Sequence, residues 1–242
     1  DVRARGTAIH KAFEDFVRKF PAALPEDAAA QFEAFYIQAL VDQGMPEDAM
    51  VREHALAQEM AKWVVDFEHR RRADGRAIHV ELLGELKLNW PGGDFVLTAK
   101  TDRIEIDPQG FSHILDYKTG SPPSEPQVKA GFAPQLTLTA AILAKGGFSG
   151  LGRPRPKELL YVKVTGRRPA GEEALRGEKD GGPEVAAEKA LSGLADLIGQ
   201  YDDPRRGYIS KIAPQFSKGY VGDYDHLARV FEWSTSGEGS DE

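Results

Sequence analysis

The spacing of hydrophobic residues changes near residue 75, and this change constrains the fold more than any other feature of the sequence. Before it, apolar residues recur every three or four positions, which is typical of amphipathic helices. We predict helices at 6–20, 26–43 and 47–73, which end at Pro21, Gly44 and Gly75. The N-terminal third is therefore expected to be a helical lobe.

After residue 75 the pattern becomes strand-like. We predict strands at 79–89, 95–106 and 111–117, separated by the turn signals Pro91-Gly-Gly93 and Asp107-Pro-Gln-Gly110. These strands should form an antiparallel meander. Further along, we predict loops at 120–131 and 166–182, helices at 134–145, 184–201 and 224–233, and a strand at 158–165.

The predicted fold class is α/β, with a mixed central sheet flanked by helices and a helical N-terminal lobe. At roughly 150 residues per domain, the 242 residues suit one large domain. We divide it into a helical lobe (1–75), an α/β core (76–233) and a flexible tail (234–242). Because the chain opens with Asp1 and shows no signal-peptide pattern, we interpret it as a C-terminal fragment of a longer chain.

Composition and missing motifs exclude several classes of protein. The net charge of −7 argues against bulk electrostatic attraction to nucleic acid or to an anionic membrane. The absence of cysteine excludes disulfides, thiolate zinc sites and iron–sulfur clusters. No run of about 18 apolar residues is present, so no membrane-spanning helix is expected. The motifs of P-loop motors, serine hydrolases and zincins are also missing.

Two acidic residues and one lysine stand out within the predicted meander: Asp102, Asp116 and Lys118. Because strand side chains alternate between faces, Asp116 and Lys118 should share one face, with Cα atoms ~6.5 Å apart. The tight turn at 107–110 should bring Asp102 close to Asp116 on the neighbouring strand. Such close carboxylates repel each other unless a cation lies between them, and a hard divalent ion suits oxygen ligands. The alternative is an ordinary solvated cross-strand pair.

The surrounding motifs make this arrangement resemble a known family. Asp102 followed by Asp116-Tyr-Lys118 resembles the signature of the PD-(D/E)XK nucleases. Gly6-Thr-Ala-Ile-His10, Asp116-Tyr-Lys-Thr-Gly120 and Pro134-Gln-Leu136 resemble the motifs of its RecB-like exonucleases, in the expected order. Within that group, the sequence is similar to the C-terminal nuclease domains of the AddB family of alphaproteobacteria.

The resemblance implies roles for five residues. His10, Asp102, Asp116 and the main-chain carbonyl of Tyr117 would bind Mg²⁺, for which Mn²⁺ could substitute. Lys118 would position the nucleophilic water. For His10, the alternative is a half-buried histidine with no catalytic task. No iron–sulfur cluster of the kind held by some relatives can form, because the chain has no cysteine.

Two further residues match weaker parts of the family pattern. Glu85 matches an acidic residue on the strand before that of Asp102, and Gln135 would contact the site or the DNA backbone. Glu85 could equally be a surface strand residue. Gln135 follows a proline at a predicted helix start, where a polar residue needs no special reason.

The resemblance also implies a function and partners. It predicts a Mg²⁺-dependent exonuclease domain that cuts the 5′-ended strand during resection of double-strand breaks, as part of the AddB subunit of the AddAB helicase–nuclease. The expected partners are single-stranded DNA delivered by a helicase motor, the AddA subunit and the remainder of AddB. The expected location is the bacterial cytoplasm, associated with the nucleoid. The alternative is an inactive module of the same fold that docks a partner or grips DNA.

Overall fold

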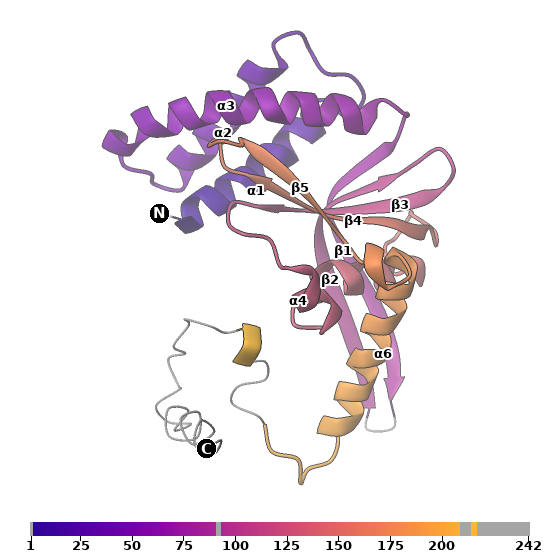
Figure 1. Ribbon diagram of the computed structural model, residues 1–242. Helices are drawn as coiled ribbons and strands as arrows, with labels where there is room; N and C mark the ends of the chain where they lie inside the picture. The colour runs from indigo at the N-terminus through magenta and orange to yellow at the C-terminus, as the bar shows by residue number, and fades with distance from the viewer. Residues whose placement is uncertain (1, 91–92, 209–213, 217–242) are drawn as a thin grey trace, which may run out of the picture. The chain divides into compact units, whose positions relative to one another are not determined.

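The computed structural model describes residues 2–90, 93–208 and 214–216 (Figure 1). The chain divides into two compact units, Asp1–Ala195 and Asp196–Glu242. The first unit contains the whole sheet and all the predicted site residues. In the second unit, Tyr201 stacks on Tyr208 with ring centroids 5.0 Å apart, and a short 3-10 helix, η2, covers Pro214–Phe216. The single-domain assignment over 1–242 stays a prediction.

Three helices open the chain, as the hydrophobic spacing predicts: α1 (Val2–Lys19), α2 (Ala28–Asp42) and α3 (Glu47–Arg72). Helix α2 ends at Asp42, and Gly44, two residues later, has a φ of 73°, in the left-handed region that glycine adopts without strain. In the described ranges, no helix combines the length and apolar character needed to cross a bilayer.

The described strands form one five-stranded sheet in the order β1-β2-β3-β4-β5. They are β1 (Ala77–Trp90), β2 (Gly93–Ile106), β3 (Phe111–Lys118), β4 (Arg155–Val164) and β5 (Gly171–Arg176). Strands β1 to β3 are the predicted antiparallel meander. Strand β4 runs parallel to β3, and the crossover between them contains α4 (Glu125–Lys129) and α5 (Gln135–Ala144). The predicted α/β class with a mixed sheet is confirmed.

The two predicted loops contain regular structure, so those predictions are wrong in part. Residues 166–182 include β5 and a 3-10 helix, η1 (Glu178–Asp180), because β5 pairs antiparallel with β4. Residues 120–131 include α4, whose start is stabilised by a capping box between Ser124 and Gln127. Helix α6 (Pro183–Tyr201) is present as predicted. The predicted helix 224–233 and tail 234–242 lie outside the described residues.

The sheet separates two hydrophobic cores. Leu115 and Tyr117 of β3 pack with α1, α2 and α3 on one face. Ile114 and its β2 neighbour Ile104 pack with α5 on the other face, together with Ala187 of α6. Consecutive residues of β3 therefore enter different cores, as strand geometry requires. Figure 1 shows α1, α2 and α3 gathered on one side of the sheet.

One glycine is required by close packing. Gly84 lies in β1 under the ring of Phe148, and a Cβ atom at this position would stand 2.5 Å from that ring. Real Cβ contacts are not this short, so any larger residue would push Phe148 out of its fully buried place beside α5.

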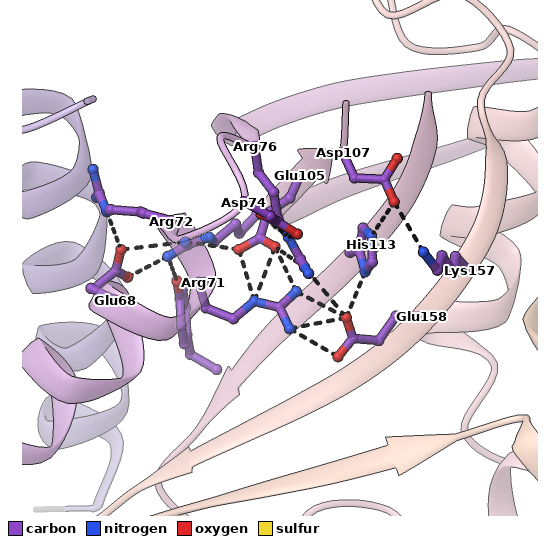
Figure 2. Close-up of polar contacts among 12 residues, drawn as sticks. Glu68, Arg71, Arg72, Asp74, Arg76, Glu105, Asp107, His113, Lys157 and Glu158 are labelled. Carbon is purple, nitrogen blue, oxygen red and sulfur yellow. Dashed lines mark hydrogen bonds and ion pairs between the residues drawn. The ribbon is translucent and has the colours of Figure 1, made fainter. Parts of the chain in front are cut away.

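A buried charged network joins the end of α3 to the sheet (Figure 2). Arg71 bridges Glu105 of β2 and Glu158 of β4, with Nε–Oε2 and Nη1–Oε1 distances of 3.0 and 2.9 Å. Arg72 and Arg103 both pair with Glu68. We call this group of residues the α3–sheet network. Its members are Glu68, Arg71, Arg72, Arg76, Arg103, Glu105, Asp107, His113, Lys157 and Glu158.

The basic run His69–Arg72 at the end of α3 is divided between solvent and this network. His69 and Arg70 are exposed, which is usual for charges that complement the helix dipole. Arg71 is only 7% exposed, and its guanidinium is held by two carboxylates from the sheet. Its partners Glu105 and Glu158 are 34 and 87 residues away in sequence, so no local pattern could reveal them.

Candidate active site

The strand register brings Asp102 and Asp116 next to each other. The β2–β3 ladder pairs Arg103 with Leu115, and one step further along both strands are the two aspartates. They share the sheet face of Ile104 and Ile114, which lie two positions away in the same core. The β2–β3 pairing ends at Arg103 and Leu115, so the aspartates lie where the two strands separate.

Asp102 of β2 lies where the strands separate, and its side chain contacts β3 and α1. Its Oδ2 accepts a hydrogen bond from the main-chain N–H of Tyr117, with an N–O distance of 2.8 Å. Its Oδ1 lies 3.1 Å from Nδ1 of His10 on α1. The carboxylate therefore takes the place of the next ladder bond and fixes α1 beside the end of β3.

Asp116 is held by a second pair of contacts. Its Oδ2 forms an ion pair with the Lys118 ammonium, and its Oδ1 accepts a hydrogen bond from Nε2 of Gln135 on α5. Lys118 Nζ also donates to Gln135 Oε1 at 3.4 Å. Gln135 thus contacts both the carboxylate and the ammonium, and it fixes their separation.

The electrostatics of this cluster are unusual for a surface site. The Asp116 side chain is only 3% exposed, and burial together with the charge of Asp102 raises its pKa to about 6. Burial lowers the pKa of His10, but its contact with Asp102 outweighs burial and raises it overall. Lys118 remains 29% exposed and can reach a substrate from the surface. A buried carboxylate beside a second one favours a nearby cation.

The donor set fits a hard divalent ion in its chemistry. Two carboxylates, an imidazole and the Tyr117 main-chain carbonyl are ligand types that Mg²⁺ and Mn²⁺ accept. Asp116 Oδ2 is buried and makes no hydrogen bond of normal geometry within the described residues, although it touches the Lys118 ammonium. Among those same residues, no three histidine, aspartate or glutamate side chains form a cluster that could hold a metal. The two predicted carboxylate ligands are therefore neighbours: Asp102 contacts His10, and Asp116 contacts Lys118 and Gln135.

Glu85 is the one predicted residue that the structure does not bring to this cluster. It is exposed on β1 and pairs in register with Thr98, four positions along β2 from Asp102. Val80 pairs with Arg103 and Leu82 pairs with Thr101, so Glu81 lies on β1 opposite Asp102. It has a φ of 55°, rare for a residue with a side chain, and forms an ion pair with Lys100. The positive φ of Glu81 has no signature in the sequence.

Tyr161 is another neighbour of the cluster that the motifs do not indicate. It pairs with Asp116 across the parallel β3–β4 ladder, and the Lys118 ammonium lies 5.6 Å from the centre of its ring. Its buried hydroxyl has no hydrogen-bond partner in the described part of the chain. Burial and the charge of Asp116 raise its pKa to about 12, so the phenol stays protonated. Only the parallel placement of β4 brings Tyr161 here.

Tyr117 has its side chain on the opposite face of the sheet. Its ring stacks on Phe13 of α1, with centroids 3.8 Å apart and planes 9° apart. Its hydroxyl accepts a hydrogen bond from Arg103 Nη1 at 3.2 Å. Tyr117 is thus anchored in the helical lobe, while its backbone belongs to the cluster through its N–H bond to Asp102.

Comparison with known proteins gives a family and several partial relatives. A protein of Rickettsia conorii is 37% identical over 131 residues, covering 45% of this chain and 16% of that protein. A Rickettsia bellii protein is 34% identical over 123 residues, covering 46% and 15%, and a Rickettsia felis protein is 37% identical over 89 residues, covering 37% and 10%. All three are described as uncharacterized, and the match spans at most about a sixth of their length.

A solved structure also matches. The crystal structure of SSO0001 covers 81% of this chain and 87% of its own, at 12% identity and a TM-score of 0.34. The sequence pattern of the PD-(D/E)XK nuclease superfamily matches residues 1–212, which include the whole sheet and every residue of the cluster. The chain therefore belongs to the PD-(D/E)XK nuclease superfamily.

Proposed function

We propose that this chain is a metal-dependent deoxyribonuclease domain whose active site contains Asp102, Asp116 and Lys118. The observation that carries the proposal is their arrangement: two carboxylates adjacent across the end of the β2–β3 ladder, with a lysine ion-paired to the buried one. In this proposal His10 and Gln135 complete the site through their contacts with Asp102 and Asp116. Glu85, which lies away from the cluster, is a weaker candidate.

Each residue has a task that follows from its contacts. Asp102, Asp116, His10 and the Tyr117 carbonyl would hold a divalent ion, which when bound supplies charge stabilisation at the scissile phosphate and a more acidic water. Lys118 is partly exposed next to Asp116, so its ammonium can orient the attacking water and stabilise negative charge in the transition state. Gln135 keeps Asp116 and Lys118 in place.

The biological reaction of the domain can be specified further. We propose an exonuclease that leaves 5′-phosphate and 3′-hydroxyl ends and acts on the 5′-ended strand, as the nuclease domain of an AddB subunit. Resemblance of the motifs to the AddB family supports this, and so does the net charge of −7. An acidic domain gains little from electrostatic search for DNA. The domain is therefore suited to a DNA strand that a helicase motor delivers to it, within a complex that contains AddA and the remainder of AddB.

The test is cleavage of end-labelled DNA with Mg²⁺ or Mn²⁺ at low salt. Asp116→Asn and Lys118→Ala should each lower the rate by about 10²-fold or more, the scale for loss of a preorganised electrostatic contact. Asp94→Asn and Lys87→Ala are matched controls, because both residues are exposed on strands β2 and β1. Cleavage that survives Asp116→Asn would refute the assigned site.

Calorimetry separates the active domain from an inactive module of the same fold. An active site should bind Mn²⁺ in a way that Asp102→Asn abolishes and Asp94→Asn does not. If the chain binds no ion and cuts no DNA, the docking or DNA-gripping module becomes the better description.

A further inference from the structure

A pocket of about 160 Å³ lies at the ends of strands β3 and β4. Thr119 and Thr165, which follow the ends of the parallel strands β3 and β4, line it together with Arg5 of α1 and Glu53 of α3. Ligands in α/β proteins tend to bind outside the carboxyl ends of parallel strands. The pocket is therefore in a place where a substrate group can be expected.

The pocket is close to the cluster along two elements. Thr119 directly follows Lys118, and a Cβ atom on Gly6 of α1 would stand 3.8 Å from the Thr119 hydroxyl. On α1, Arg5 lies five positions before His10, roughly 7.5 Å along the axis and about 140° around it, so the two side chains leave different faces of the helix. The pocket wall belongs to the core on the Tyr117 face of the sheet. A strand with a phosphate at Lys118 would therefore pass the end of β3 at Thr119 for its neighbouring base to enter the pocket.

The chemistry of the walls favours a nucleobase over a phosphate. Leu56, Met60 and Val164 give the pocket an apolar side, which suits the face of a ring. The charge of Arg5 in this wall is compensated by its ion pair with the buried Glu53, so this part of the wall carries no net positive charge for a phosphate. A cavity of about 150 Å³ can hold a benzene ring, so this volume suits a single ring system.

Glu53 positions a hydrogen-bond donor in the wall of the pocket. Its Oε1 accepts from Arg5 Nε at 3.0 Å, and its Oε2 accepts a long bond from the Tyr36 hydroxyl at 3.3 Å. Its side chain is 0% exposed, so a ligand cannot touch the carboxylate itself. The Arg5 side chain is 26% exposed, and its remaining N–H groups can donate to the edge of an unstacked base.

Arg167 places a cation at the rim of the pocket. It is exposed, and no ion pair of its guanidinium is found within the described ranges. A guanidinium at such a position suits a phosphate of the strand whose base lies inside.

We propose that this pocket is a subsite that receives one unpaired base of a single DNA strand, next to the phosphate at the Asp102–Asp116–Lys118 cluster. The inference rests on the proposed function for the identity of the substrate. It adds that the domain favours a strand whose bases are free of pairing, because a paired base must first break its pairing and stacking before it can enter the pocket.

The test measures binding without cleavage. The whole chain is titrated in EDTA, at low salt, with single-stranded oligonucleotides that carry one abasic nucleotide at successive positions. We expect affinity to fall about fivefold or more at one position near the end, the lower range for loss of a single base contact. Equal affinity for every abasic position would overturn the proposal.

A variant locates the effect. Leu56→Trp fills the pocket and should abolish the position dependence, whereas Leu83→Trp, the same change at a residue 75% exposed on β1, should leave it intact. Position dependence that survives in folded Leu56→Trp would overturn the proposal. If that variant fails to fold, Arg167→Gln replaces it. Arg167→Gln should weaken all oligonucleotides alike and lower the salt slope by about one, and an unchanged slope would count against the subsite.

The outcome for the subsite is distinguishable from that for the proposed function. Mg²⁺-dependent cleavage without position-dependent binding would overturn the subsite and leave the nuclease. Position-dependent binding without cleavage would support the subsite and refute the nuclease.

Discussion

Arg103 is the residue whose replacement best tests how the fold supports the site. It is fully buried in β2, next to Asp102, and it contacts Glu68, Glu105 and the Tyr117 hydroxyl. Burial lowers its pKa, but the surrounding carboxylates outweigh burial and hold the pKa well above the ordinary value. We expect Arg103→Met to destabilise the chain, because it leaves buried carboxylates without one of their cations.

The magnitude follows from what remains in the network. Removing one partner of a buried ion pair costs about 3–5 kcal/mol. After Arg103→Met, Glu68 still contacts Arg72, and Glu105 still contacts Arg71 and Arg76. The loss should therefore be near the lower limit, about 3 kcal/mol. For a chain of this size, that corresponds to a fall in Tm of about 6–12 °C.

The assay is urea unfolding followed by circular dichroism, with thermal unfolding as a check. Arg18→Met is the matched control, because Arg18 is 55% exposed and forms a surface pair with Glu14 in α1. This control should change stability by no more than about 0.5 kcal/mol. If Arg103→Met costs no more than Arg18→Met, the view that the α3–sheet network stabilises the fold is refuted.

The remaining predictions concern acid stability, a site carboxylate and DNA affinity. Burial raises the pKa of Glu158, but contacts with His113 and Arg71 outweigh it and lower the pKa to about 2. The stability from this group should be complete above about pH 4.5 and lost as pH falls toward 2, at most about 3 kcal/mol. Acid unfolding of Glu158→Gln should show a weaker pH dependence in that window, and an unchanged dependence would contradict it. Glu81→Gln should lower DNA cleavage more than Glu85→Gln, because Glu81 lies in register with the cluster; equal rates for both would count against this. The chain alone should bind DNA weakly at ~150 mM salt, and tight binding in a filter or anisotropy assay would refute that.

The helices and strands could be predicted largely from the sequence, because burial on one side imposes a spacing on apolar residues. The three helices before residue 75 and the meander after it are where that spacing puts them. Strand β5 was not predicted because half of Gly171–Arg176 is exposed and the segment lacks apolar alternation. It is a strand because β4 supplies its hydrogen-bond partners.

Part of the candidate site could also be predicted from the sequence, and part could not. The order of Asp102, Asp116 and Lys118 along two strands joined by a tight turn was enough to predict that they lie close together, since local register follows from the turn. Sequence could not place Glu81 rather than Glu85 beside Asp102, because that depends on a left-handed residue within β1.

Local order therefore follows from the amino-acid sequence alone: element types, the meander and the motif residues that share a face. Which distant groups meet depends on how the elements pack. Glu158 reaches Arg71, Tyr161 lies beside Asp116 and Glu53 forms the wall of a pocket. The physical reason is that hydrophobic spacing encodes which side of an element is buried. It does not encode which charged partner, many residues away, will compensate a group that becomes buried there.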